Sequence, residues 1–148
     1  MSASKQFGDK VLPAACSSPL HEAIQGHHVQ LIPTQPEHFR ELYEVVGGSE
    51  KAALYDYMPY GPFDDIESLQ ERIVAFATSK DPLFWTICQI VSGRLLVWLS
   101  LLRIDAANRV AEIGHILYTP QLQRTTAATE AWYLLADKVV RSCVSCRV

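Results

Sequence analysis

The stretch Ala111-Glu-Ile-Gly-His-Ile-Leu-Tyr-Thr-Pro-Gln-Leu-Gln-Arg-Thr-Thr-Ala-Ala-Thr-Glu-Ala131 decides the fold. Its first part continues a strand that we expect over residues 110–118 and that Pro120 ends. A tight loop follows, and then a helix start made of small residues. Backbone amides at a helix start have no intrahelical partner and carry the positive end of the helix dipole. The stretch therefore predicts a strand, a loop and a helix whose first turn suits a diphosphate.

Upstream of this stretch the sequence has the two-residue period of β-strands. Residues 83–90 are rich in β-branched and aromatic side chains, and residues 94–104 are apolar on both faces, as expected of a central strand. Ser92-Gly93 supplies a turn between them, and Asp105-Ala-Ala-Asn108 supplies the next turn. Together with residues 110–118, these segments predict a meander of three antiparallel strands.

Helical signals occur in three places. Thr34-Gln-Pro-Glu37 is a capping box that predicts a helix start, and Gly47-Gly48 predicts the end of that helix. A second helix is expected to open at Asp64-Asp65 and to end before Asp81-Pro82. The last helix, over about residues 126–144, repeats apolar residues on one side, which predicts that this side packs on the sheet.

The order of these elements gives the fold class. A short strand over residues 28–33 precedes two helices, three antiparallel strands and the final helix. This order predicts an α+β fold with helices on a mainly antiparallel sheet. Residues 1–26 are expected to form a flexible N-terminal arm, residues 27–141 the single domain, and residues 142–148 a divergent tail.

Composition narrows the classes of function. The chain has 148 residues, of which 49% are hydrophobic and 20% charged, and its net charge is −3. That charge gives no phosphate-seeking surface, so no nucleic-acid partner is expected. No apolar run approaches the length of about 20 residues that spans a bilayer, so we expect no membrane partner and a cytoplasmic protein. Cys143-Val-Ser-Cys146 is a lone C-x-x-C pair without two further ligands, so no metal site is expected.

Several motifs resemble the GNAT superfamily of N-acetyltransferases, in particular its RimJ/RimL-like branch. Gln123-Arg-Thr-Thr-Ala-Ala128 matches in register the family signature Q/R-x-x-G-x-G/A at the turn into a helix. The resemblance covers roughly residues 27–141. Four further segments are typical of this branch: Tyr60-Gly-Pro-Phe63, Leu102-Arg-Ile-Asp105, Ala111-Glu-Ile-Gly114 and Thr129-Glu130-Ala131.

The resemblance implies acetyl-CoA as the co-substrate. The residues implied for its diphosphate are Gln123, Arg124, Thr125, Thr126, Ala127 and Ala128. Amides around Ile116, Leu117 and Tyr118 are implied to polarise the thioester carbonyl. Thr126 departs from the family, which most often has glycine there. Either this position needs φ > 0 or close phosphate approach, which threonine weakens, or it takes ordinary helical angles and its hydroxyl adds a hydrogen bond to the phosphate.

Two side chains are candidates for the base that deprotonates the acceptor amine. Glu112 lies on the strand beside the cofactor loop, and its alternative role is a surface ion pair with Arg103 on the neighbouring strand. His115 is expected on the opposite face of the same strand, because side chains alternate. It titrates near neutrality and could relay protons, and its alternative role is packing.

The aromatic loop before the second helix is implied to face the acceptor, because the substrate groove of the family lies near it. Its candidates are Tyr57, Tyr60 and Phe63, together with Tyr55. The alternative is a hydrophobic plug that covers the sheet, which is the expected role for at least two of the four.

The resemblance also implies an incomplete domain. In the family the corresponding helix is followed by a further strand, a helix and a closing strand pair, so we expect a GNAT-like fold lacking the C-terminal strands. The expected function is transfer of an acetyl group from acetyl-CoA to a primary amine, either a protein N-terminus or a small molecule of a detoxification or secondary-metabolite pathway. The alternative is a catalytically impaired domain that binds acetyl-CoA or a partner protein. An open sheet edge left by missing strands favours a homodimer.

Overall fold

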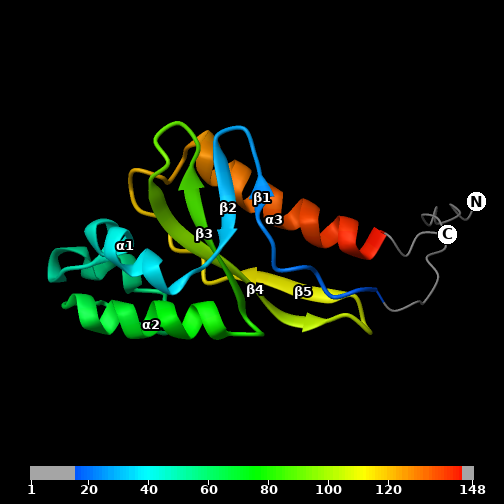
Figure 1. The fold of residues 1–148 in the computed structure, drawn as a ribbon, viewed down its shortest axis with the longest axis horizontal. Coiled ribbons are helices and arrows are strands. Elements are labelled where there is room, and N and C mark those ends of the chain that lie inside the picture. Colours follow the sequence, from blue (N-terminus) through cyan, green and yellow to red (C-terminus); the bar gives the residue numbers. More distant parts are fainter. Residues whose placement is uncertain (1–15, 145–148) are drawn as a thin grey trace, which may run out of the picture.

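The computed structural model describes residues 16–144, which form one sheet with helices on both of its faces (Figure 1). No helix of this part of the chain is long and apolar enough to cross a membrane. Cys146 lies outside the described residues, and the side chain of Cys143 is not described. The elements in chain order are β1 (Ile24–Gln25), β2 (Val29–Pro33), the 3-10 helix η1 (Pro36–His38), α1 (Phe39–Val46), the 3-10 helix η2 (Ser49–Tyr55), α2 (Ile66–Thr78), β3 (Leu83–Gln89), β4 (Leu95–Asp105), β5 (Val110–Gly114) and α3 (Thr126–Val144).

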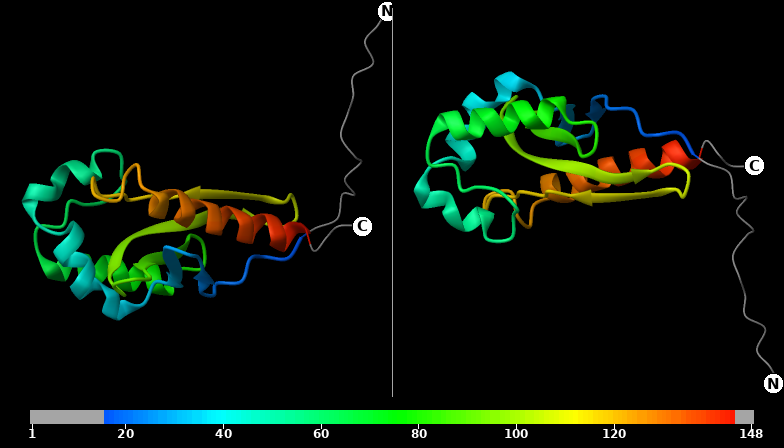
Figure 2. Two further views of the ribbon diagram at one scale, coloured as in Figure 1. Left: turned by 90° about the horizontal axis from the view of Figure 1, so that it is seen from above. Right: turned by 90° about the horizontal axis from the view of Figure 1, so that it is seen from below.

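The sheet has five strands in the order β1-β2-β3-β4-β5, and every neighbouring pair is antiparallel. α1 and α2 lie on one face and α3 lies along the other, as the turned views show (Figure 2). β1 and β5 are the edge strands. The core is continuous through the sheet because β4 is apolar on both faces, with Val97, Trp98 and Leu99 all fully buried. The predicted α+β class and the meander of three strands are therefore confirmed.

α2 begins where the sequence predicted it. Asp65 is its N-cap, and its Oδ1 accepts a hydrogen bond from the Ser68 N–H at 2.7 Å. Leu69, Ile73 and Phe76 form its buried stripe. The capping box predicted for the first helix, at Thr34–Glu37, is wrong at its first residue. The Thr34 side chain is buried, and its hydroxyl bonds to that of Thr86.

In place of that box, the imidazole Nδ1 of His38 accepts a hydrogen bond from the backbone N–H of Gln35 at 3.2 Å. The same ring nitrogen lies 3.0 Å from Thr86 Oγ1, which is 3.1 Å from Thr34 Oγ1. The box is therefore shifted by one residue. The shift arises because the buried Thr34 hydroxyl finds a partner in the neighbouring strand, so it is not available to the helix.

We expect the free energy of unfolding to fall as the pH drops below about 6.5. Burial lowers the pKa of His38, against the opposing influence of Glu37 and Glu41, and burial also lowers the pKa of His115. A lowered folded-state pKa means that the unfolded state binds protons first, so the stabilisation is complete above the unfolded pKa and is lost as pH falls through the folded pKa. Urea unfolding at several pH values measures this loss. His38→Gln is expected to reduce the pH dependence, and an unchanged slope in that variant would contradict the role of His38.

The expected strand over 110–118 ends early. β5 stops at Gly114, because His115 has a φ of +47° and leaves the extended conformation. β4 is irregular at a matching place: Arg103 has a φ of +52°, and the register shifts between Leu102 and Asp105. The carboxylate of Asp81 holds this irregularity by accepting from the backbone N–H groups of Arg103 and Ile104, at 2.9 and 3.1 Å.

The flexible arm expected over residues 1–26 stays a prediction, and its described part, residues 16–26, contacts the sheet and α3. The indole N–H of Trp85 donates to the Glu22 carbonyl at 2.9 Å, and a ring nitrogen of His21 lies 2.8 Å from the Phe84 carbonyl. Lys138 of α3 forms an ion pair with the Glu22 side chain. β1 then adds an edge strand that the sequence pattern did not reveal, since two residues are too few to show a period.

Candidate functional site

The segment after β5 leaves two backbone amides open. The Leu117 N–H donates to the Trp98 carbonyl of β4 at 3.3 Å. The neighbouring amides of Ile116 and Tyr118 have no partner in the described part of the chain. Because successive N–H groups of an extended segment point to opposite sides, these two face away from β4. Of the three residues implied for the thioester carbonyl, Ile116 and Tyr118 thus offer amides, whereas the amide of Leu117 is used within the sheet.

The N-terminus of α3 presents a run of unpaired amides. The N–H groups of residues 124–127 have no acceptor among the described residues. Thr125 is the capping residue: its hydroxyl accepts from the Ala128 N–H at 3.2 Å and donates to the Leu122 carbonyl at 2.6 Å. Four consecutive free amides at the positive end of a helix of 19 residues form a strong anion-binding feature. The amide of Ala128 is not among them, and the residue is buried.

Thr126, which stands where the family most often has glycine, has ordinary helical geometry. Thr126 is the first residue of α3, and the left-handed residue of this loop is Arg124, with a φ of +61°. A threonine therefore causes no backbone strain at position 126, and its side chain is exposed. The sequence could not locate the left-handed residue, because the strain falls on an arginine.

Three side-chain bonds fix the loop between β5 and α3. The Gln123 amide donates to the Tyr118 carbonyl at 2.8 Å, and the Tyr118 hydroxyl donates to the Ala128 carbonyl at 3.0 Å. The third is the bond from the Thr125 hydroxyl to Leu122. Burial raises the pKa of Tyr118 to about 12, so it stays a hydrogen-bond donor at neutral pH. The Gln123 side chain thus stabilises the loop that carries the free amides.

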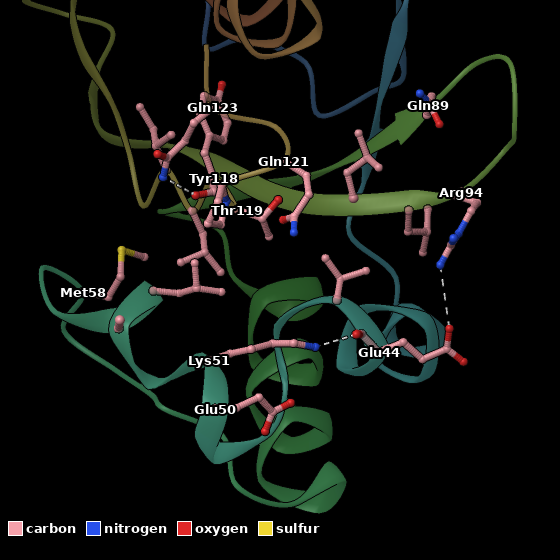
Figure 3. A pocket seen from close by; sticks show the side chains of 18 of the residues that line it. Glu44, Glu50, Lys51, Met58, Gln89, Arg94, Tyr118, Thr119, Gln121 and Gln123 are labelled. Carbon is pink, nitrogen blue, oxygen red and sulfur yellow. Dashed lines mark hydrogen bonds and ion pairs between the residues drawn. The ribbon is translucent and has the colours of Figure 1, made fainter. Parts of the chain in front are cut away.

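A cavity of about 1020 Å³ lies between this loop and the helices on the other side (Figure 3). One wall is the segment 116–121 with Gln123, and the other is formed by the ends of α1 and η2 and by Tyr57 and Met58. Figure 3 shows the Gln121 side chain reaching from the loop toward the space between the walls. The volume is at the upper end of the range for small-molecule sites, about 300–1,000 Å³.

His115 lies in an aromatic cluster beside this cavity. Its ring stacks on Tyr60 with centroids 5.5 Å apart and lies 5.3 Å from the ring of Phe84. The Trp98 indole N–H donates to the Tyr60 hydroxyl at 3.0 Å, which fixes Tyr60. The Nδ1 atom of His115 is buried and has no hydrogen-bond partner in the described part of the protein. Burial lowers the pKa of His115, so the ring is neutral at pH 7 and can accept a proton.

The expectation that Glu112 and His115 lie on opposite faces is wrong. Glu112 is the cross-strand partner of Leu102, which lies on the same face of β4 as Trp98. His115 reaches the same face, because its left-handed backbone breaks the two-residue alternation. The carboxylate of Glu112 is held by Arg103 at 2.8 Å, and neither Glu112 nor His115 is among the residues that line the cavity.

The four aromatic residues of the loop differ in exposure. Tyr57 is 99% exposed and lines the cavity, whereas Phe63 is 5% exposed and packs edge-to-face against the buried Tyr55. The Tyr55 hydroxyl donates to the Val46 carbonyl at 2.9 Å. Tyr60 is half-buried between α2 and the sheet, and the guanidinium of Arg72 lies 5.2 Å from the centre of its ring.

Two features of the site had no counterpart in the sequence reasoning. The helix η2 supplies part of one cavity wall, and the sequence does not predict it because its short 3-10 turns show no period of 3.6. The role of Glu130 was also missed: its carboxylate accepts from the backbone N–H groups of His27, His28 and Val29, at 2.8, 2.7 and 2.9 Å. This residue ties the second turn of α3 to the turn between β1 and β2. Within residues 16–142, no cluster of three or more metal-ligating side chains occurs.

Comparison with known proteins places the fold. No family model and no curated protein matches the chain. A GCN5-related N-acetyltransferase from Brucella melitensis is 27% identical with a TM-score of 0.83, over 88% of this chain and 59% of that one. A Chromobacterium violaceum protein described as a probable acetyltransferase of the GNAT family is 26% identical with a TM-score of 0.80, over 95% of this chain and 72% of that one. An acetyltransferase of the GNAT family from Bacillus anthracis, 14% identical with a TM-score of 0.66 over 80% of this chain and 66% of that one, shares the fold.

The chain therefore has the GNAT fold of N-acetyltransferases, as the resemblance in its sequence implied. It spans 59% of the length of the Brucella melitensis protein and 72% of that from Chromobacterium violaceum. Its assignment to the RimJ/RimL-like branch stays a prediction.

Proposed function

We propose that this protein binds acetyl-CoA at the loop before α3 and transfers the acetyl group to a primary amine. The observation that carries the proposal is the run of four amides at residues 124–127, which have no acceptor within residues 16–144. They lie at the start of a long helix and directly follow Gln123, which lines a large cavity. The diphosphate would accept from these amides, with Arg124 adjacent to them. The pantetheine arm would follow the segment 116–118, where two amides are open. The similarity to acetyltransferases of the GNAT family supports the same reaction.

The chemistry follows from the groups around the cavity. A neutral amine attacks the thioester carbonyl, and the amide of Ile116 or Tyr118 stabilises the negative charge that develops on the carbonyl oxygen. The amine nitrogen then loses a proton, through a water, to the imidazole of His115, which follows Gly114 and precedes the lining residue Ile116. The carbon–sulfur bond breaks, and the thiolate leaves and takes up a proton. His115 is a better candidate base than Glu112, since the carboxylate of Glu112 is already paired with Arg103.

His115→Phe is expected to lower kcat by about 100-fold, the effect of one general base, because the ring still fills the aromatic cluster but cannot take a proton. Glu112→Gln is the matched variant, and its kcat is expected to stay within about twofold of the wild type, since the Arg103 pair lies on the surface. Steady-state rates of acetyl transfer measure both. A large loss in Glu112→Gln with little change in His115→Phe would reverse the two roles.

A second candidate function is a domain that binds acetyl-CoA without turnover. It rests on the surroundings of the two candidate bases: Glu112 is paired with Arg103, and neither Glu112 nor His115 is among the residues that line the cavity. Calorimetric titration with acetyl-CoA, followed by acetyl-transfer assays on a panel of amines, separates the two. Binding with turnover supports the transferase, binding without turnover supports the second function, and no binding contradicts both. A homodimer through an open sheet edge, a RimJ/RimL-type acceptor and a cytoplasmic location remain predictions of the sequence.

A further inference from the structure

The lining of the cavity includes four apolar side chains, here called the apolar wall: Val45 from α1, Leu54 from η2, Met58 from the following loop and Leu96 from β4. All four are partly buried and pack against the core. Side chains of this kind stabilise an apolar group placed against them and offer it no hydrogen bonds.

The charged groups of the cavity lie at its rim and balance one another. The guanidinium of Arg94 lies 3.9 Å from the carboxylate of Glu44, and the Lys51 ammonium donates to the Glu44 carbonyl at 2.6 Å (Figure 3). Glu50 is the remaining charged residue of the lining. Two carboxylates and two cations leave the rim with no net charge, so it provides no excess of negative charge for an acceptor with several ammonium groups.

Building on the proposed function, we propose that the acceptor is a small primary amine carried on an uncharged, apolar body, such as an arylalkylamine or a long alkylamine. Its amino group would lie near Ile116, where the lining approaches His115. Its body would lie against the wall of Val45, Leu54, Met58 and Leu96. Burying an alkyl or aryl group there is favourable, and the gain grows with the apolar area that is removed from water.

The same wall disfavours the two other acceptors that the reaction admits. A peptide would bring backbone amides against side chains that cannot form hydrogen bonds with them, and each unpaired buried group weakens binding. A polyamine would place its second ammonium group near Lys51 and Arg94 as well as near the carboxylates. The selectivity for an apolar amine over a peptide or polyamine therefore arises because the apolar wall offers no hydrogen-bond partner to polar groups of the acceptor.

The test uses the full chain and begins with calorimetric titration of acetyl-CoA. Turnover is then compared for 2-phenylethylamine, hexylamine, spermidine and a tripeptide with a free N-terminus. Saturation-transfer NMR of the same four amines with the CoA-loaded protein ranks their binding independently of turnover. We expect kcat/KM, or binding where turnover is slow, to be at least about tenfold higher for the two apolar amines, which corresponds to about 1.4 kcal/mol.

Met58→Gln is the diagnostic variant, because it places an amide in the apolar wall from a loop position. It is expected to weaken apolar amines about tenfold while the Kd of acetyl-CoA stays within about twofold. Val91→Gln is the matched control, since Val91 is 93% exposed and does not line the cavity. Preference for spermidine or the tripeptide, or an unchanged amine affinity in Met58→Gln, overturns the acceptor class alone. Failure to bind acetyl-CoA overturns the proposed function, and the acceptor class with it.

Discussion

Replacing Ala127 with glutamate is expected to weaken acetyl-CoA binding by about tenfold or more without loosening α3. The new carboxylate lies in the first turn, where negative charge stabilises a helix by about 0.3–1 kcal/mol. The same charge competes with the diphosphate for the free amides of residues 124–127 and repels it. The variant therefore separates binding from stability, because the two change in opposite directions. Calorimetry measures the Kd, and thermal unfolding measures the Tm.

Thr126→Pro tests the same amides without adding a charge. Thr126 is the first residue of α3, and proline is well tolerated at that position because it removes an N–H that the helix does not use. Loss of one amide–phosphate bond is expected to raise the Kd of acetyl-CoA about tenfold. Ala75→Glu, at an exposed position of α2, is the charge control and should bind as the wild type does. If both Ala127→Glu and Thr126→Pro bind acetyl-CoA as tightly as the wild type does, the start of α3 is not part of the acetyl-CoA site.

Glu130→Ala is expected to lower the free energy of unfolding by about 2–3 kcal/mol. The carboxylate accepts from three consecutive backbone N–H groups, at residues 27, 28 and 29, and no other group replaces it there. Its loss frees the turn between β1 and β2 from α3. Since Glu130 follows the free amides by one turn of the helix, we also expect weaker acetyl-CoA binding in this variant. Glu71→Ala, which removes an exposed glutamate of α2, is the matched control for urea unfolding.

The contribution of Glu130 is expected to disappear in acid. Burial alone would raise the pKa of Glu130, but the bonds from His27, His28 and Val29 together outweigh it and lower the pKa. A lowered carboxyl pKa gives a stabilisation that is present above the unfolded value, about 4.3, and is lost as pH falls through the folded pKa. The stability difference between wild type and Glu130→Ala should therefore shrink below pH 4. A difference that is constant from pH 7 to pH 3 would contradict this role.

Much of the fold was predictable because its elements are regular. The strands β3 and β4 and the helix α2 have the periods and caps that define such elements, and their bounds agree with the sequence within one or two residues. The loop into α3 was also predictable, because small residues after a strand and a proline mark a helix start. The local sequence determines the conformation of these elements, and tertiary packing does not change it.

The site was less predictable, because it depends on residues whose backbone departs from the usual pattern. His115, Arg103 and Arg124 all have positive φ, and none is a glycine or asparagine that would signal it. The turn at His115 moves its side chain to the face of the sheet that carries Glu112. The cavity depends on η2 and Met58, which are brought to the loop by tertiary packing alone. Sequence reasoning identified the chemistry of the loop but not the wall opposite it.

The most direct test of the account is an NMR titration of the uniformly ¹⁵N-labelled chain with acetyl-CoA, followed through the backbone amide resonances. We expect the largest shifts on residues 124–127, smaller shifts at Ile116 and Tyr118, and none along α2. Shifts absent from residues 124–127 at saturating acetyl-CoA, or concentrated elsewhere, would contradict it.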